Sequence, residues 1–213
     1  QRQGQEDFPY VYSVDAFNRF LKFLSLVPNV DDLSQKLKPM NWQLFIFSQL
    51  FAWLDLDGLP RYVNTILSMA RAQGKTMIAG ISLNYSFLIE TIGLSNQDFL
   101  VSSLNFEQTM KLYTYVKSMM SRIIENEPFK SLAVETGLQL YTREIKATAD
   151  SNSIQTISFE SGKFDSKHFK LAVADEVGEL RSDEGISKIT SGQVNTEGSR
   201  FIEISTAYQV PNV

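Results

Sequence analysis

The chain has no cysteine and only one histidine, His168, among its 213 residues. The lack of cysteine excludes structural disulfides and thiolate metal sites and is compatible with a reducing compartment. A single histidine argues against a histidine-based zinc site and against a Ser-His-Asp triad. No apolar run reaches the length of a membrane-spanning helix, and the N-terminus lacks the basic-then-apolar layout of a signal peptide. We therefore expect a soluble protein that does not insert into membranes.

The charge balance is slightly acidic, with a formal net charge of −4. This balance argues weakly against a free-standing nucleic-acid binder, whose surface is usually basic, and it leaves room for local basic patches. Hydrophobic residues make up 43% of the chain and charged residues 21%, which is ordinary for a globular protein. The length suits one large domain with a real core.

The first 40 residues are predicted to form an N-terminal helical segment. Apolar side chains recur at helical spacing from Val14 to Leu24, and Ser13 is placed as an N-cap. Pro28 ends this helix, and a short second helix is expected over residues 31–37. Residues 41–213 are predicted to form the main domain, which opens with a third helix over residues 42–52.

Beyond this point the pattern alternates between strands and helices. Strands are expected at residues 62–68, 98–102, 143–148, 154–159, 170–174 and 201–205, and helices at residues 77–83 and 106–124. The two strands at 143–159 are predicted to form a hairpin. Apolar strands alternating with helices predict an α/β fold with a mainly parallel central sheet and helices on both faces. Ligands bind such sheets at the carboxyl ends of the strands.

A Gly-Lys-Thr turn joins the strand at 62–68 to the next helix. It reads Arg71-Ala72-Gln73-Gly74-Lys75-Thr76. Strand, Gly-Lys-Thr turn and helix form the context of a phosphate-binding loop, in which backbone N–H groups face the anion, the lysine supplies charge and the hydroxyl ligates Mg²⁺. The usual loop begins with a glycine five positions before the glycine of the Gly-Lys pair, and Met69 stands in its place.

Two further strands end in chemically suggestive residues. The strand at 170–174 leads into Asp175-Glu176, which together suit a Mg²⁺ ligand and a base that deprotonates the attacking water. On its own such a pair is also a common polar strand end. The strand at 201–205 leads into Ser205-Thr206-Ala207, whose hydroxyls either sense a γ-phosphate or form a solvated strand end.

The ordered set of these segments resembles the ATPase domain of the large terminase subunit, the DNA-packaging motor of tailed bacteriophages. The resemblance covers the chain from about residue 39 onward and includes Trp42-Gln43 and Phe106-Glu107-Gln108. It implies a three-layer P-loop ATPase core. In that family the loop often lacks its first glycine and carries an arginine. Here Met69 stands in place of the glycine, and Arg71 is the arginine.

The resemblance also implies roles for individual residues. ATP and Mg²⁺ are the expected ligands. Glu176 would be the general base and Arg71 an arginine finger or sensor, while Asp175 and Thr76 would hold Mg²⁺. Gln43, together with Trp42, would contact the adenine. The other expected contacts to the nucleotide are Gln73, Gly74, Lys75, Ser205 and Thr206. Ser205 and Thr206, with Ala207, would also couple hydrolysis to movement.

The implied partners are double-stranded DNA, the portal protein and the small terminase subunit, in the host cytoplasm. We expect a homo-oligomeric ring during packaging and a monomer in isolation. A neighbouring subunit would supply a second arginine, with Arg143 weakly preferred over Arg122, Arg181 and Arg200. Large terminases also carry a C-terminal nuclease domain, so we expect this chain to be an ATPase fragment or a separately made domain.

Two other functions compete with the packaging motor. One is a helicase-like or other nucleic-acid-dependent ATPase with the same core. The other is a nucleotide-binding assembly module with little turnover, against which Glu176 argues, because a binder needs no general base.

Overall fold

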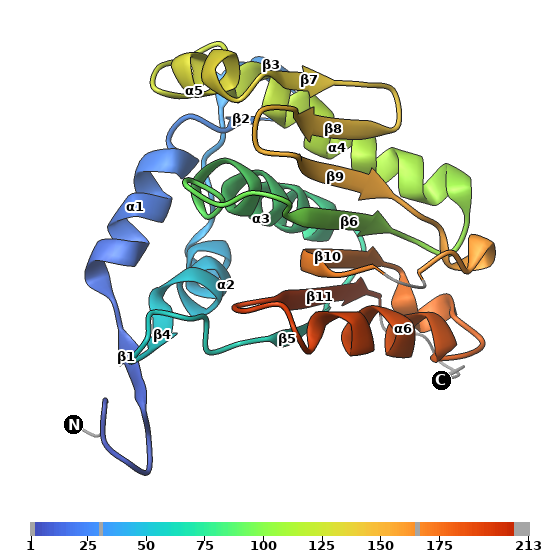
Figure 1. The fold of residues 1–213 in the computed structure, drawn as a ribbon, viewed down its shortest axis with the longest axis horizontal. Helices are drawn as coiled ribbons and strands as arrows, with labels where there is room; N and C mark the ends of the chain where they lie inside the picture. Colours follow the sequence, from blue (N-terminus) through green and yellow to red (C-terminus); the bar gives the residue numbers. More distant parts are fainter. Residues whose placement is uncertain (1–2, 30–31, 165–166, 207–213) are drawn as a thin grey trace.

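The computed structural model describes residues 3–29, 32–164 and 167–206, and its centre is a seven-stranded sheet (Figure 1). The strands lie in the order β5 (Asn64–Ser68), β11 (Arg200–Ser205), β10 (Phe169–Asp175), β6 (Asp98–Ser102), β9 (Asn152–Thr156), β8 (Glu144–Ala147) and β7 (Leu138–Leu140). The first five run parallel. At one edge, β8 pairs antiparallel with β9, and β7 pairs antiparallel with β8. The predicted mainly parallel sheet and the hairpin of β8 and β9 are confirmed.

Helices cover both faces of this sheet. On one face, α3 (Lys75–Ile89) and α4 (Phe106–Ile123) pack against each other and against the central strands. On the other face, α6 (Glu184–Gln193) packs against β10. The predicted three-layer α/β architecture is therefore confirmed. The sequence pattern predicted α3 to be shorter, and it gave no signal for α6 or for α5 (Phe129–Glu135).

Strand β10 lies inside the sheet, between β11 and β6, and its sequence suits this position. Its residues Leu171, Ala172, Val173 and Ala174 are all fully buried, because both faces of the strand are covered by helices. Alternate side chains enter the larger core under α3 and α4 and the smaller core under α6. A continuous apolar run of this kind is typical of a central parallel strand.

The N-terminal region contributes to the larger core. Helix α1 (Val14–Leu24) begins at the predicted N-cap Ser13, whose Oγ accepts a hydrogen bond from the Ala16 N–H at 3.1 Å. The fully buried Phe20 lies within 5.0 Å, centroid to centroid, of three rings, those of Phe47, Phe51 and Tyr85. Helix α1 and the helix α2 (Asn41–Ala52) therefore share one hydrophobic core with α3.

The predicted second helix over residues 31–37 is wrong. The described part of this stretch forms strand β3 (Asp32–Lys36), which pairs antiparallel with β2 (Pro28–Asn29). The Asp32 carboxylate accepts hydrogen bonds from the backbone N–H and the hydroxyl of Ser34, at 3.1 and 2.6 Å. A helix of seven residues is marginal on its own, so this local side-chain bonding and the pairing with β2 prevail.

A cluster of aromatic side chains around Arg61 packs the start of the chain against the segment before β5. Strand β1 (Tyr10–Tyr12) pairs antiparallel with β4 (Trp53–Asp55). The guanidinium of Arg61 lies 4.6–5.4 Å from the ring centroids of four aromatic residues, Phe8, Tyr10, Trp53 and Tyr62. Such cation–π contacts favour the docked position of β1.

Arg200 holds the sheet to the helices from inside the protein. It is 3% exposed, donates hydrogen bonds to the Leu50 carbonyl oxygen at 3.2 Å and the Ser86 hydroxyl at 2.8 Å, and pairs with Glu90. Its guanidinium also stacks over the Phe51 ring. A buried cation with this many partners is a structural element of the domain.

We predict that Phe20→Ala lowers the free energy of unfolding by about 3–5 kcal/mol, because it leaves a cavity among buried rings. Chemical denaturation monitored by circular dichroism measures this loss. The matched control is Val14→Ala on the same helix, where the side chain is 60% exposed and the change should stay within about 0.5 kcal/mol. Equal effects of the two variants would contradict a core role for α1.

Candidate functional site

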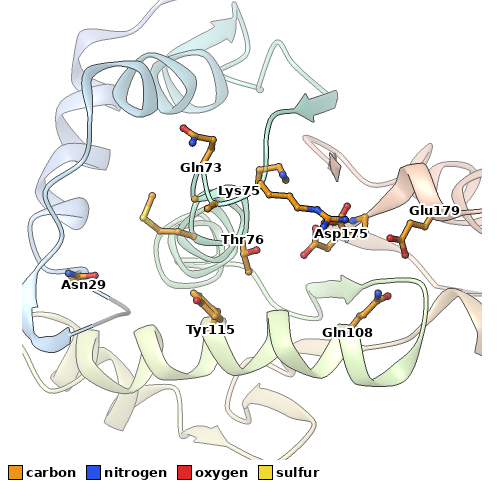
Figure 2. Close-up of a pocket in the computed structure, with 13 residues that line it drawn as sticks. Asn29, Gln73, Lys75, Thr76, Gln108, Tyr115, Asp175 and Glu179 are labelled. Atoms are coloured by element: carbon orange, nitrogen blue, oxygen red, sulfur yellow. Dashed lines mark hydrogen bonds between the residues drawn. The ribbon is translucent and has the colours of Figure 1, made fainter. Parts of the chain in front are cut away.

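A pocket of about 640 Å³ opens at the carboxyl ends of the parallel strands, between the phosphate loop, the end of β10 and helix α4 (Figure 2). Its walls include Arg71, Gln73, Gly74, Lys75, Thr76, Asp175 and Glu176. The structure therefore brings together residues that lie about a hundred positions apart in the sequence. This is the place where parallel sheets bind ligands.

The loop before α3 has the geometry of an anion cradle. Gly74 is the N-cap of α3 and has a left-handed backbone with φ of 77°, a conformation that glycine adopts without strain. The first N–H groups of α3 have no partner within the helix, and the helix dipole makes this end positive. Ala72 is also left-handed, with φ of 60°, which costs about 1–2 kcal/mol for a non-glycine residue.

Lys75 fixes the shape of this loop. It is 7% exposed, and its Nζ donates hydrogen bonds to the carbonyl oxygens of Met69 and Ala70 at 2.9 and 3.1 Å. An ammonium group has three protons, so a further proton remains for an anion in the pocket. Lys75 thus links the end of β5 to the start of α3 and places a positive charge on the pocket wall.

Asp175 lies at the end of β10, beside Ile204 of β11. Burial raises the pKa of its carboxyl to about 6, and the negative charge of Glu176 adds to the rise. The Glu176 N–H, which donates to Asp175 Oδ1 at 2.9 Å, and the charge of Lys75 act in the opposite direction. The carboxylate is therefore a desolvated acceptor whose charged form is disfavoured by burial.

Glu176 is held in an unusual backbone conformation next to Thr206. It has φ of 54° and ψ of 40°, a left-handed geometry that is rare for glutamate. Its Oε2 accepts hydrogen bonds from the backbone N–H and the hydroxyl of Thr206, at 3.3 and 3.2 Å. Strained backbone of this kind gathers at functional sites because the surrounding contacts impose it.

Ser205 and Thr206 lie behind the acidic pair. Ser205 Oγ accepts a hydrogen bond from the Gly178 N–H at 3.1 Å, within the short helix η2 (Val177–Glu179), and donates one to the Thr206 carbonyl oxygen. Both side chains are buried. In the described part of the chain they contact Glu176 and η2 and do not line the pocket, and Ala207 lies outside the described residues.

Gln43 supports the loop from α2. Its Oε1 accepts a hydrogen bond from the Met40 N–H at 2.9 Å, and its Nε2 would lie 3.2 Å from a Cβ atom built on Gly74. It is 7% exposed and is not among the described residues that line the pocket. Trp42 donates to the sulfur of Met40 and packs partly buried on the core. Contact of either side chain with adenine stays a prediction.

Several residues of the pocket wall were not predicted. Glu179 lies three residues after Glu176. Its closeness to Asp175-Glu176 in the sequence is a signal that could have predicted its place in the pocket. Gln108 belongs to the segment Phe106-Glu107-Gln108, whose sequence indicated no role for it. Asn29 and Tyr115 carry no local signal, because the packing of β2 and α4 places them there; these four residues join Ala72 and Met77 in the lining.

The four arginines considered for a neighbouring site differ in their surroundings. Arg200 is buried within its own subunit, as described above, and so cannot reach another one in this structure. Arg122 pairs with Glu125 at 3.0 Å. Arg143 and Arg181 are exposed, and the Arg143 guanidinium lies 4.9 Å from the centre of the Phe106 ring at the start of α4.

The described residues include neither a membrane-spanning helix nor a cluster of metal-binding side chains. None of the helices in ranges 3–29, 32–164 and 167–206 is both long and apolar enough to cross a membrane. The same ranges contain no group of three or more His, Asp or Glu side chains that could hold a metal ion.

The fold matches known phage proteins. The HK97 bacteriophage large terminase superposes with a TM-score of 0.67 at 20% identity, over 89% of this chain and 37% of that one. The ATPase domain of the Thermus phage P74-26 large terminase matches with a TM-score of 0.63 at 12% identity, over 94% of this chain and 72% of that one. This chain thus spans little more than a third of the HK97 protein. No match was found among curated proteins.

The sequence itself matches a family model over residues 41–210, described as the ATPase domain of the terminase large subunit. These residues include the phosphate loop, the acidic pair and the serine–threonine segment after β11. The match covers most of the chain and agrees with the fold. The chain therefore belongs to the family of terminase large subunit ATPase domains.

Proposed function

We propose that this chain hydrolyses ATP to ADP and phosphate with Mg²⁺, and that this reaction drives double-stranded viral DNA into a procapsid. The observation that carries the proposal is the meeting of Lys75, Asp175 and Glu176 in one pocket at the carboxyl edge of the sheet. A positive charge, a buried carboxylate and a second carboxylate are the groups that phosphoryl transfer requires. Family membership supports the same function.

The phosphate chain of ATP would lie on the loop. Gly74 and the first turn of α3 direct N–H groups at the β- and γ-phosphates, and Lys75 supplies a charge that is already aligned by the Met69 and Ala70 carbonyl oxygens. Arg71 and Gln73 line the same pocket. Arg71 would neutralise charge that develops on the γ-phosphoryl oxygens.

The donor atoms near the phosphates fit Mg²⁺. The Thr76 hydroxyl and the Asp175 carboxylate are hard oxygen ligands from two walls of one pocket, and Mg²⁺ is typically held by one or two carboxylates together with phosphate oxygens and water. When bound, the ion supplies charge neutralisation to the β- and γ-phosphates. Burial disfavours the charged form of Asp175 and raises its pKa, and a bound cation would favour the charged form.

Glu176 would act as the general base. A water oxygen forms a bond to the γ-phosphorus while the bond to the β-γ bridging oxygen breaks, and that electron pair leaves with ADP. One proton of the water passes to the Glu176 carboxylate and the other stays on the released phosphate. Thr206 donates to the same carboxylate, so the position of the base depends on the segment after β11.

This contact gives a physical route for coupling. A change in the hydrogen bonds of Glu176 during hydrolysis alters its bond to Thr206, and Ser205 ties the same segment to η2. We propose that this linkage transmits the reaction to a DNA-gripping element. Double-stranded DNA, the portal protein, the small terminase subunit and a ring of identical subunits are the partners of the proposed motor, which acts in the host cytoplasm.

We expect Lys75→Ala to weaken ATP binding at least about 100-fold, because it removes the charge that faces the phosphates. Isothermal titration with ATP and Mg²⁺ measures the dissociation constant. The matched control is Lys111→Ala on α4, where the lysine is 72% exposed and pairs with Glu107. Unaltered nucleotide affinity in Lys75→Ala would remove the phosphate-loop assignment.

Glu176→Gln should keep ATP and Mg²⁺ bound while kcat falls about 10²–10⁴-fold, because the amide cannot accept the proton. Phosphate release in single-turnover assays, with ATP affinity measured in parallel, separates chemistry from binding. Glu135→Gln, at an exposed residue of α5, serves as the control and should hydrolyse ATP at the parent rate. A Glu176→Gln protein with parent turnover would show that another group is the base.

If a neighbouring subunit supplies an arginine, turnover per subunit should rise with protein concentration, by up to about 10³-fold for a complete arginine finger. Arg143→Ala should abolish this rise, since Arg143 is exposed beside the start of α4. Arg122→Ala is the control, because Arg122 is engaged with Glu125 in its own subunit. Turnover that is independent of concentration, from monomer to oligomer, would indicate a site completed within one subunit.

A further inference from the structure

Gln108 is a polar side chain of the nucleotide pocket that the steps above leave without a role. It lies on α4, and Figure 2 shows it extending across the pocket toward Asp175 and Glu179. In the part of the pocket wall that holds three carboxylates, those of Asp175, Glu176 and Glu179, it supplies a neutral amide. An amide offers an acceptor and donors side by side, whereas a carboxylate only accepts.

The first turn of α4 fixes the position of Gln108. Asn105 is the N-cap of this helix, and its side chain accepts a hydrogen bond from the Gln108 N–H at 2.9 Å. Thr109, the next residue, donates through its hydroxyl to the Asn105 carbonyl oxygen. The helix therefore starts at a defined residue, and the Gln108 side chain leaves it at a defined place in the pocket.

Ser103 connects the Gln108 amide to the acidic pair. Its hydroxyl lies 3.4 Å from Gln108 Oε1 and 3.1 Å from the Asp175 carbonyl oxygen, and it is 1% exposed. Strands β6 and β10 pair in register up to Ser102 and Ala174, so Ser103 and Asp175 follow at the same level of the sheet. The hydroxyl has one proton, which can go to only one of these two oxygens at a time, so Ser103 places the Gln108 amide beside the end of β10 without bonding both groups at once.

In-line attack sets a requirement that Glu176 alone does not meet. The attacking water must direct a lone pair at the γ-phosphorus, so its two protons point elsewhere and each needs an acceptor. Glu176 takes one. Gln108 Oε1 has a second lone pair beyond the one that faces Ser103, and Gln108 Nε2 carries protons that suit a γ-phosphoryl oxygen.

We propose that Gln108 orients the attacking water, accepting its second proton in a hydrogen bond and donating to the γ-phosphoryl group. This role rests on the proposed hydrolysis of ATP and adds a residue to it. Proton transfer still goes to Glu176, and no bond to Gln108 forms or breaks. The amide acts on the geometry of the water, so its loss affects the chemical step more than nucleotide binding.

The test compares Gln108→Ala and Gln108→Glu with the parent chain. Single-turnover phosphate release from ATP and Mg²⁺ should fall about 10²–10³-fold in both variants, because the alanine removes the amide and the glutamate lacks its donor. KM, and the dissociation constant of a β,γ-imido ATP analogue, should change less than about threefold in Gln108→Ala. This split between kcat and binding is the result that a purely structural side chain would not produce.

Two controls isolate the effect. Glu107→Ala changes the adjacent residue in the same turn of α4, at a side chain that is 82% exposed, and should hydrolyse ATP at the parent rate. The thermal unfolding midpoints of both Gln108 variants should lie within a few degrees of the parent value, which excludes loss of the fold as the cause.

The outcomes separate this role from the proposed function. If Glu176→Gln loses turnover and Gln108→Ala keeps it, Gln108 has no part in orienting water and the hydrolysis proposal stands. If Gln108→Ala loses affinity for the imido analogue in proportion to its rate, the side chain binds nucleotide and the proposal is overturned. If the parent shows no Glu176-dependent turnover at any protein concentration, both proposals fail together.

Discussion

The site depends on the position of β10 between β6 and β11. In-register parallel pairing on both sides brings the ends of three strands to one level of the sheet. Ser103 follows β6, and its hydroxyl lies 3.1 Å from the carbonyl oxygen of Asp175, the last residue of β10. Thr206 follows β11 and donates to the carboxylate of Glu176, the residue after Asp175. A change of register by one residue would turn every side chain of β10 to the opposite face, and the acidic pair would leave the pocket.

The wall of this pocket carries charges of both signs. Lys75 and the start of α3 provide positive potential, and Asp175, Glu176 and Glu179 provide negative charge across the same space. Burial and the neighbouring carboxylates raise the pKa of Asp175, while Lys75 lowers it. Such a site holds acids close together at the cost of stability, and a cation with a polyphosphate would satisfy both sets of charges.

The sequence predicted the parts of the site that are formed by local patterns. The Gly-Lys-Thr turn follows a strand-like run and Asp175-Glu176 follows an apolar strand, so both were expected at the carboxyl edge of one sheet, where the pocket lies. Tyr115 and Gln108 could not be assigned in this way, because the packing of α4 brings them to the pocket from a separate element. A helix was predicted over residues 31–37, whereas residues 32–36 form a strand, because the bonds that Asp32 makes to Ser34 and the pairing with β2 could not be read from the local pattern.

The docking of the N-terminal region has a practical consequence. The family model begins at residue 41, whereas Phe20 and Phe23 of α1 belong to the same hydrophobic core as α2 and α3. A chain shortened to the matched residues would expose the rings of Phe51 and Tyr85 to water. Exposed apolar surfaces of this kind promote self-association, so the truncated protein would aggregate where the full chain does not.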